Sequence, residues 1–168
     1  MTDKLRVGLA QLNPKVGDVA GNLAKVRAAR AEAAKQGADM VLFPEMVLAG
    51  YFPEDLVLKP AFQQACHEAV EALRADTLDG GPAMFVTTPW HEDGRLYNAI
   101  VALDKGEIVG KRYKVDLPNY GVFDDKRVFS PGPMPGPIVF RGVRIGVPIC
   151  EDVWTPDVVE CIAETGGE

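Results

Sequence analysis

The sequence contains few of the residues that build metal sites and disulfide frameworks. Its 168 residues include two histidines and three cysteines, and the cysteines, at positions 66, 150 and 161, show no paired spacing. An odd number of widely spaced cysteines argues against both a zinc site and a set of disulfides, so we expect reduced thiols and no bound metal. With histidine so scarce, His67 and His91 are the sole candidates for a histidine-based reaction.

Long apolar runs and clusters of positive charge are also missing. No uninterrupted apolar segment is long enough to cross a bilayer, and no signal sequence precedes the apolar residues that begin at Leu5. The net charge is -6, which disfavours binding to nucleic acid or to an anionic membrane. No glycine-rich turn followed by Lys and Ser or Thr offers a phosphate-binding loop. We therefore expect a cytoplasmic protein that binds neither nucleic acid nor membranes.

The residues that are present describe an ordinary globular domain. Hydrophobic residues make up 47% of the chain and charged residues 25%, which suits one domain over residues 1–168 with a substantial core. Period-two and helical patterns alternate along the chain, as is typical of an α/β protein. The predicted strands cover residues 5–12, 40–43, 84–88, 96–103, 107–111, 138–140 and 143–149, and the predicted helices cover residues 22–36, 61–74 and 158–164.

The stretch of residues 143–157 carries the first chemical signal. Alternating apolar residues at 143–149 predict a buried strand, and Thr-Pro-Asp at 155–157 predicts the start of a helix. Cys150 would then lie at a strand-to-helix corner, where a helix N-terminus makes a thiol easier to ionise. Free cysteines are often buried and structural, so this stretch alone leaves both interpretations open.

Two further candidates follow predicted strands. Glu45 comes directly after the apolar strand 40–43 and has apolar neighbours, where a carboxylate is costly to desolvate unless it is paired or protonated. It could act as a general base, although a loop glutamate that points into water is the alternative. Lys114 opens a long loop, rich in aromatics and charges, of the kind that is usually functional. Attack on an amide needs a nucleophile, a proton carrier and a positive group, which Cys150, Glu45 and Lys114 could supply.

Three motifs that contain these residues resemble the nitrilase (carbon-nitrogen hydrolase) superfamily. They are LFPEM at residues 42–46, KVDLPNYGVFD at 114–124 and VPICEDVW at 147–154. Within the superfamily, GYFPEDL at 50–56, residues 117–124 and CED at 150–152 are most similar to the glutaminase domains of glutamine-dependent NAD+ synthetases. The resemblance runs from Leu5 to the end of the chain.

The resemblance implies a role for each matched residue. Cys150 would be the nucleophile, Glu45 the proton acceptor and Lys114 the group that stabilises the tetrahedral intermediate. Tyr120 would contact the glutamine substrate, and Glu151 would lie beside its amino-acid end. The amide of L-glutamine would be hydrolysed through a thioester, and the ammonia would serve ATP-dependent conversion of deamido-NAD+ to NAD+.

The resemblance also implies a fold, and this chain departs from the pattern of the family in two respects. The fold expected is the N-terminal part of a nitrilase-type α-β-β-α sandwich, incomplete after the helix that follows the nucleophile. The family usually has a glutamate where this chain has Asp125, which is one methylene shorter and puts its support of Lys114 in question. No cofactor is expected for the amidase chemistry, whereas ATP and magnesium belong to a synthetase domain that is absent here and would accept the ammonia. The complete enzyme is expected to be a homo-oligomer.

Three alternatives remain open. A different nitrilase-type amidase would act on a small free amide and would have no synthetase partner. An inactive fragment would act as a structural piece alone, with exposed strand edges and apolar faces that favour aggregation. A cysteine-histidine hydrolase would require His67 or His91 to orient on Cys150.

Overall fold

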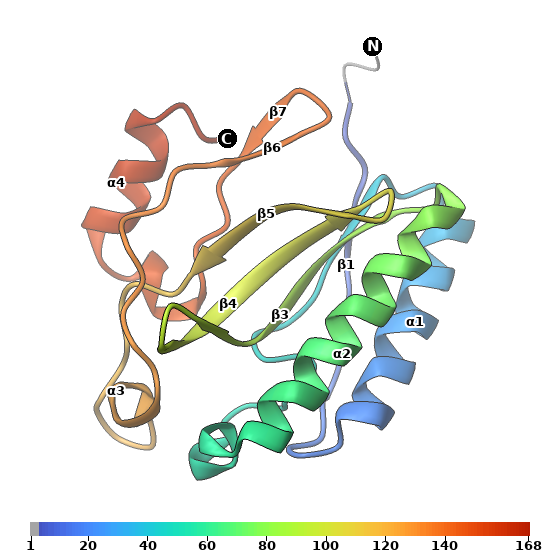
Figure 1. The fold of residues 1–168 in the computed structure, drawn as a ribbon. Helices are drawn as coiled ribbons and strands as arrows, with labels where there is room; N and C mark the ends of the chain where they lie inside the picture. Colours follow the sequence, from blue (N-terminus) through green and yellow to red (C-terminus); the bar gives the residue numbers. More distant parts are fainter. Residues whose placement is uncertain (1–3) are drawn as a thin grey trace.

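A computed structural model describes residues 4–168, so the first three residues of the predicted domain lie outside the described part. Within that part, a five-stranded sheet has the order β1-β2-β3-β4-β5, and a separate two-stranded sheet pairs β6 with β7 (Figure 1). The strands are β1 (Val7–Leu9), β2 (Met40–Leu42), β3 (Ala83–Glu92), β4 (Arg95–Asp104), β5 (Glu107–Tyr113), β6 (Ile138–Phe140) and β7 (Val143–Ile145). The helices are α1 (Val19–Lys35), α2 (Pro60–Asp76), α3 (Asp125–Val128) and α4 (Pro156–Glu164), with 3-10 turns η1 (Glu54–Leu58), η2 (Thr77–Asp79) and η3 (Cys150–Val153).

The first two predicted strands and the helix between them are present, with different bounds, and form a βαβ unit. Strands β1 and β2 run parallel and are joined by α1. The helix begins three residues before the predicted Asn22, because the Asp18 side chain caps it by accepting a hydrogen bond from the Gly21 N–H. The predicted strand 5–12 is wrong in length, since β1 pairs only through Val7–Leu9 with the equally short β2.

The three consecutive strands β3, β4 and β5 are confirmed and are longer than the sequence predicts. Strand β3 continues through Pro89 to Glu92, whereas the predicted strand ends at residue 88. Proline is tolerated because β2 pairs only with Ala83–Phe85, so at Pro89 only the β4 side of the strand has a neighbour. The Asp93-Gly94 turn has positive φ at both residues, as a tight hairpin requires.

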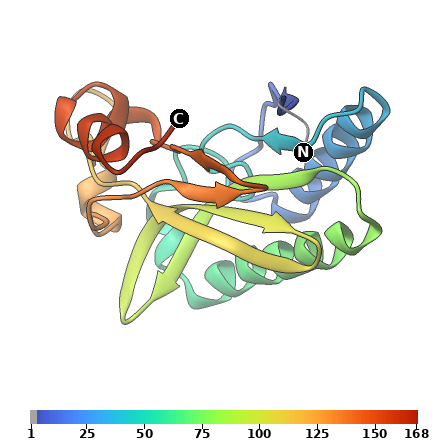
Figure 2. The same cartoon turned by 90° about the horizontal axis from the view of Figure 1, so that it is seen from above.

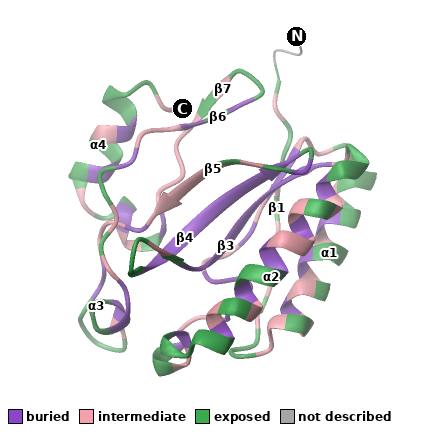
Figure 3. Ribbon diagram, in the orientation of Figure 1, coloured by how far each residue is buried: buried purple, intermediate pink, exposed green. Residues whose placement is uncertain are grey.

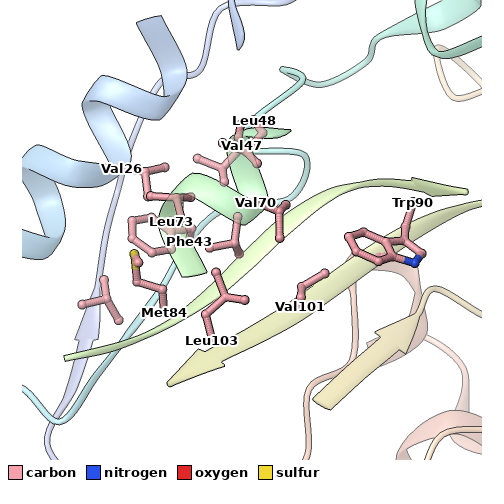
Figure 4. Close-up of a cluster of buried hydrophobic side chains, with 14 residues drawn as sticks. Val26, Phe43, Val47, Leu48, Val70, Leu73, Met84, Trp90, Val101 and Leu103 are labelled. Atoms are coloured by element: carbon pink, nitrogen blue, oxygen red, sulfur yellow. The ribbon is translucent and has the colours of Figure 1, made fainter. Parts of the chain in front are cut away.

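The sheet separates two apolar layers. Helices α1 and α2 lie side by side over one face, while the β6–β7 hairpin lies over the other (Figure 2). The helix-side core includes side chains from α1, the β2 end, α2, β3 and β4 (Figure 4). On the opposite face, Phe85 and Ile100 pack with Ile138 and Phe140 of β6. Alternate residues of β3 therefore face opposite cores, which explains why most of β3 and β4 is buried (Figure 3).

The predicted strand 143–149 is wrong beyond Ile145. Residues 146–149 have no strand partner, and Pro148 has no N–H to donate to one. The backbone of Glu168 instead lies alongside, donating to Arg144 O at 2.6 Å and accepting from Gly146 N at 3.0 Å. The following helix, α4, is confirmed and begins at Pro156.

The outer edge of the sheet is exposed. Strand β1 is at the end of the strand order, and its Leu9 side chain is 68% exposed. Such an edge offers unpaired backbone groups to another chain, as the sequence-based concern about aggregation anticipates. In the described residues, 4–168, no helix is long and apolar enough to cross a membrane.

Candidate active site

Glu45 lies in a turn that follows β2, and neighbouring strands fix this turn. Thr87 of β3 accepts a hydrogen bond from the Val47 N–H at 2.9 Å and donates one to the Pro44 carbonyl. Met46 takes a positive φ of 54°, which makes the reversal tight. The carboxyl group of Glu45 is directed to the sheet rather than into water, since its side chain is only 16% exposed. The alternative of a solvated loop glutamate is therefore wrong.

Lys114 comes directly after β5 and is fully buried. Its Nζ lies 2.8 Å from Glu45 Oε1 and 2.7 Å from Asp125 Oδ2. Burial alone lowers the pKa of this lysine, but the charges and hydrogen bonds of the two carboxylates outweigh burial and raise the pKa above its ordinary value. The ammonium is thus held in its charged form between two acids.

Asp125 contacts Lys114 although it is one methylene shorter than glutamate. It lies at the first residue of α3, is fully buried, and accepts a hydrogen bond from the Tyr51 hydroxyl at 3.1 Å. Burial and the nearby carboxylates raise the pKa of Tyr51, which keeps its hydroxyl protonated as a donor. The support of Lys114 that the sequence put in question is therefore present.

Cys150 begins the short turn η3 rather than a helix. Its φ is +50°, a left-handed conformation that is uncommon outside glycine and that costs about 1–3 kcal/mol. Helix α4 begins only at Pro156, so the predicted helix N-terminus does not act on this thiol. Although the residue is exposed as a whole, partial burial of the thiol raises its pKa to about 11. The negative charge of Glu45 contributes to this raised pKa, and the positive charge of Lys114 opposes it.

The expectation of an easily ionised thiol is therefore wrong in this structure. At neutral pH Cys150 is a thiol, and the carboxylate of Glu45 lies close enough to raise the pKa of that thiol, so a group that can accept its proton is nearby. The structure thus brings Cys150, Glu45 and Lys114 together. Their arrangement is a base-activated nucleophile, with an adjacent cation for a developing oxyanion.

Asp152 anchors the cysteine turn to the lysine loop. Its buried carboxylate accepts hydrogen bonds from the backbone N–H groups of Val115 at 3.0 Å, Asp116 at 2.8 Å and Ile149 at 2.9 Å. Burial raises the pKa of Asp152, and these three N–H donors oppose the shift. One side chain therefore fixes the two segments that present Lys114 and Cys150.

We expect Asp152→Ala to lower the free energy of unfolding by about 3 kcal/mol, because three N–H groups lose their acceptor at ~1 kcal/mol each. Urea denaturation measures the change. The control is Asp157→Ala, in the exposed first turn of α4, which should cost less than about 1 kcal/mol. Equal losses in the two variants would contradict the anchoring role.

Tyr120 and Glu151 also come together, at the surface beside Cys150. The Tyr120 hydroxyl lies 2.9 Å from Glu151 Oε2, and its hydrogen bond to this carboxylate raises the pKa of the phenol. Both residues line a surface cavity of about 690 Å³ that extends along residues 115–120. The two predicted substrate contacts thus border a cavity large enough for a small molecule, although Glu45, Lys114 and Cys150 do not line it.

Residues that sequence reasoning missed also hold the site. Asn98 of β4 is fully buried and donates from Nδ2 to Glu45 Oε1 at 2.6 Å. An amide in the middle of the apolar strand 96–103 was the available signal, because asparagine is depleted in strands. His67 and His91 are both exposed and make no hydrogen bond to Cys150. Within residues 4–168 no cluster of three His, Cys, Asp or Glu side chains could hold a metal ion.

The fold and the grouping of a carboxylate, an ammonium and a thiol are those of a hydrolase of the α/β class, and comparison with known proteins gives its family. The carbon-nitrogen hydrolase family profile matches residues 6–168. The chain belongs to the carbon-nitrogen hydrolase family, and its fold is that of the nitrilase-type domain.

Three relatives place the chain within this family. A glutamine-dependent NAD+ synthetase from Rhodobacter capsulatus is 44% identical over 168 residues, which are all of this chain and 30% of that protein. The structure of the Acinetobacter baumannii glutamine-dependent NAD+ synthetase with ADP matches with a TM-score of 0.91 and 33% identity, over 98% of this chain and 31% of that one. A variant amidase from Nesterenkonia sp. AN1, with an acetamide moiety covalently added at its active-site cysteine, matches with a TM-score of 0.86 and 27% identity, over 98% and 62%. The chain therefore spans about a third of the length of the synthetases that it matches.

Proposed function

We propose that this domain hydrolyses the side-chain amide of L-glutamine through a thioester on Cys150. The observation that carries the proposal is the grouping of three side chains: Lys114 Nζ lies 2.8 Å from Glu45 Oε1, and the charges of both residues act on the Cys150 thiol. The similarity to glutamine-dependent NAD+ synthetases supports glutamine as the substrate. The ammonia would pass to a synthetase domain, to which the proposal assigns ATP and magnesium, for conversion of deamido-NAD+ to NAD+.

The first half of the reaction forms the thioester. Glu45 takes the proton of the Cys150 thiol as sulfur attacks the amide carbon, so that the thiol does not need to ionise beforehand. The carbonyl oxygen becomes an oxyanion near Lys114. Two of the three donors of this ammonium bind Glu45 and Asp125, which leaves one for the oxyanion. The C–N bond then breaks, and the amine leaves as ammonia with the proton held by Glu45.

The second half releases the acid. Water attacks the thioester carbon while Glu45 accepts one of its protons, and Lys114 again stabilises the oxyanion. Collapse of this intermediate breaks the C–S bond, and the proton returns from Glu45 to the sulfur of Cys150. The products are glutamate and the starting thiol, so no other reactant is consumed.

Tyr120 and Glu151 are the proposed contacts for the rest of the substrate. Glu151 carries a carboxylate at the border of the cavity beside Cys150, where it could pair with the α-ammonium group of glutamine. The hydrogen bond from Tyr120 fixes the direction of that carboxylate. A small amide has no ammonium group, so this pair would give no advantage with such a substrate.

A second candidate is hydrolysis of small free amides. It is favoured by the structural similarity to the Nesterenkonia amidase, whose active-site cysteine carries an acetamide moiety. Propionamide and L-glutamine, offered separately, distinguish the two candidates. Faster turnover of propionamide than of glutamine would replace our proposal with this one.

Release of ammonia from L-glutamine by the purified chain is the direct test. We expect release that Cys150→Ala abolishes and that Cys161→Ala, at a partly exposed cysteine on α4, leaves unchanged. A second series adds a separately expressed C-terminal part of a related synthetase, because the exposed β1 edge can accept a further strand. A folded chain that releases no ammonia in either series contradicts the proposal.

A further inference from the structure

We infer that Asn98 is a positioning residue that holds the Glu45 carboxylate in the orientation from which it can take the proton of the Cys150 thiol. The inference deepens the proposed function and rests on it for its effect on turnover. Its effect on the thiol itself can be measured without any substrate. Three features of Asn98 support it: its hydrogen bond, the orientation of its amide and its backbone contact with Lys114.

The hydrogen bond determines which oxygen of Glu45 is available. Asn98 Nδ2 lies 2.6 Å from Oε1, and Lys114 Nζ lies 2.8 Å from the same atom. Two donors therefore converge on Oε1. Oε2 is left as the oxygen that can take the proton of Cys150.

The amide of Asn98 has only one orientation that suits an ionised neighbour. Its Oδ1 is buried without a hydrogen-bond partner, and it is the one side-chain N or O atom of this kind in residues 4–168. If the amide turned over, Oδ1 would face the carboxylate oxygen Oε1 at the distance now occupied by a donor, and two acceptors would repel. The unpartnered oxygen thus reflects an amide whose direction is set by the charge on Glu45.

The backbone of Asn98 holds the other charged residue. Its carbonyl accepts a hydrogen bond from the Lys114 N–H at 2.8 Å. Because every substitution at position 98 keeps this carbonyl, a change of the side chain leaves the backbone attachment of Lys114 in place. Substitution therefore isolates the contact between Asn98 and Glu45.

A donor aimed at a carboxylate favours its ionised form. Without the donor from Asn98, the carboxylate of Glu45 would lose one of the two hydrogen bonds that stabilise its negative charge on Oε1. The rate of any reaction that depends on proton transfer from Cys150 to Glu45 falls when the solution becomes acidic, and this part of the pH profile is its acid limb. The acid limb would then move to higher pH. A side chain that only fills space would leave that limb unchanged.

The test measures the rate at which iodoacetamide alkylates Cys150 as a function of pH, with the modified peptide resolved by mass spectrometry. Asn98→Leu removes the donor at similar volume, and Asn98→Asp replaces it with an acceptor. We expect the acid limb to move up by about one pH unit in Asn98→Leu and further in Asn98→Asp. The control Thr88→Val, at an equally buried position of β3 away from Glu45, should follow the unaltered protein.

Two further measurements make every outcome decisive. In a Glu45→Gln background, Asn98→Leu should no longer move the profile, because the carboxylate is gone. In the unaltered protein labelled with 15N, the side-chain amide resonances of Asn98 should shift with pH across the acid limb, which tests the contact even if the variants do not fold. Superimposable profiles in folded variants, or an amide that does not respond, overturn the inference.

Turnover separates the inference from the proposed function. If glutamine is hydrolysed, Asn98→Leu should lower kcat at least tenfold and change KM little, because the donor acts on Glu45 rather than on substrate. If glutamine is not hydrolysed and the alkylation profile still moves, the proposed function fails and the role of Asn98 stands.

Discussion

Glu45→Gln is expected to slow amide hydrolysis by about 10²–10⁴-fold while it makes the Cys150 thiol easier to ionise. The two effects have opposite signs because Glu45 has two roles at the site. Its negative charge is among the causes that hold the pKa of Cys150 at about 11, so a neutral amide lets this pKa fall. The same substitution removes the acceptor for the thiol proton and the donor for departing ammonia. A thiolate alone cannot replace that transfer.

Two measurements check this pair of effects. Ultraviolet absorbance of the thiolate, taken as the difference from Cys150→Ser, gives the pKa, and ammonia release gives the rate. The control is Glu68→Gln on the exposed face of α2, which should change neither. A Glu45→Gln variant with a higher thiol pKa, or with full activity, would show that Glu45 does not face the sulfur as described.

Lys114→Met is expected to lower the free energy of unfolding by about 3–5 kcal/mol, because it leaves the buried carboxylate of Asp125 without a cation. Glu45 also loses a partner, although its side chain is 16% exposed and water can compensate in part. The loss should shrink as the pH falls, since protonation removes the uncompensated charge. Urea denaturation at several pH values measures it.

In the unaltered protein, the pKa of Lys114 determines how the contribution of this residue to the free energy of unfolding changes with pH. The pKa of this lysine is raised in the folded state above its ordinary value of 10.5, so its contribution to stability is complete below that pH and is lost as the pH rises through the raised pKa. Neutral and mildly alkaline solutions should therefore leave it intact.

Two variants test the mechanism of this loss. Lys35→Met, at an exposed pair with Glu32 on α1, should change stability by no more than about 0.5 kcal/mol. Asp125→Leu combined with Lys114→Met should cost less than the sum of the single changes, because the second substitution removes the charge that the first leaves unpaired. Strict additivity would mean that the two side chains do not interact.

The local elements followed from the sequence wherever one pattern dominated. The apolar run at 40–43, the Asp-Gly turn at 93–94 and the helix after Thr155 all form, because the side chains that specify them lie within a few residues. The residues at which the strands end could not be predicted from the sequence, since a strand extends only as far as its partner does. Strand β3 passes through Pro89 because β4 continues beside it, and β7 stops at Ile145 because its partner β6 begins at the paired residue Ile138.

The sequence by itself determined the chemistry available at the site. Motifs around Glu45, Lys114 and Cys150 indicated the family, and side-chain type alone limited their roles to base, cation and nucleophile. Only the tertiary structure decided the state of these groups. The pKa of Cys150 is raised rather than lowered, because the thiol meets partial burial and the charge of Glu45 instead of a helix N-terminus. Burial and charge at the site depend on every segment that contributes a residue to it. Asn98 contacts Glu45 although the two are 53 residues apart in the sequence, and Asp125 contacts Lys114 from 11 residues away.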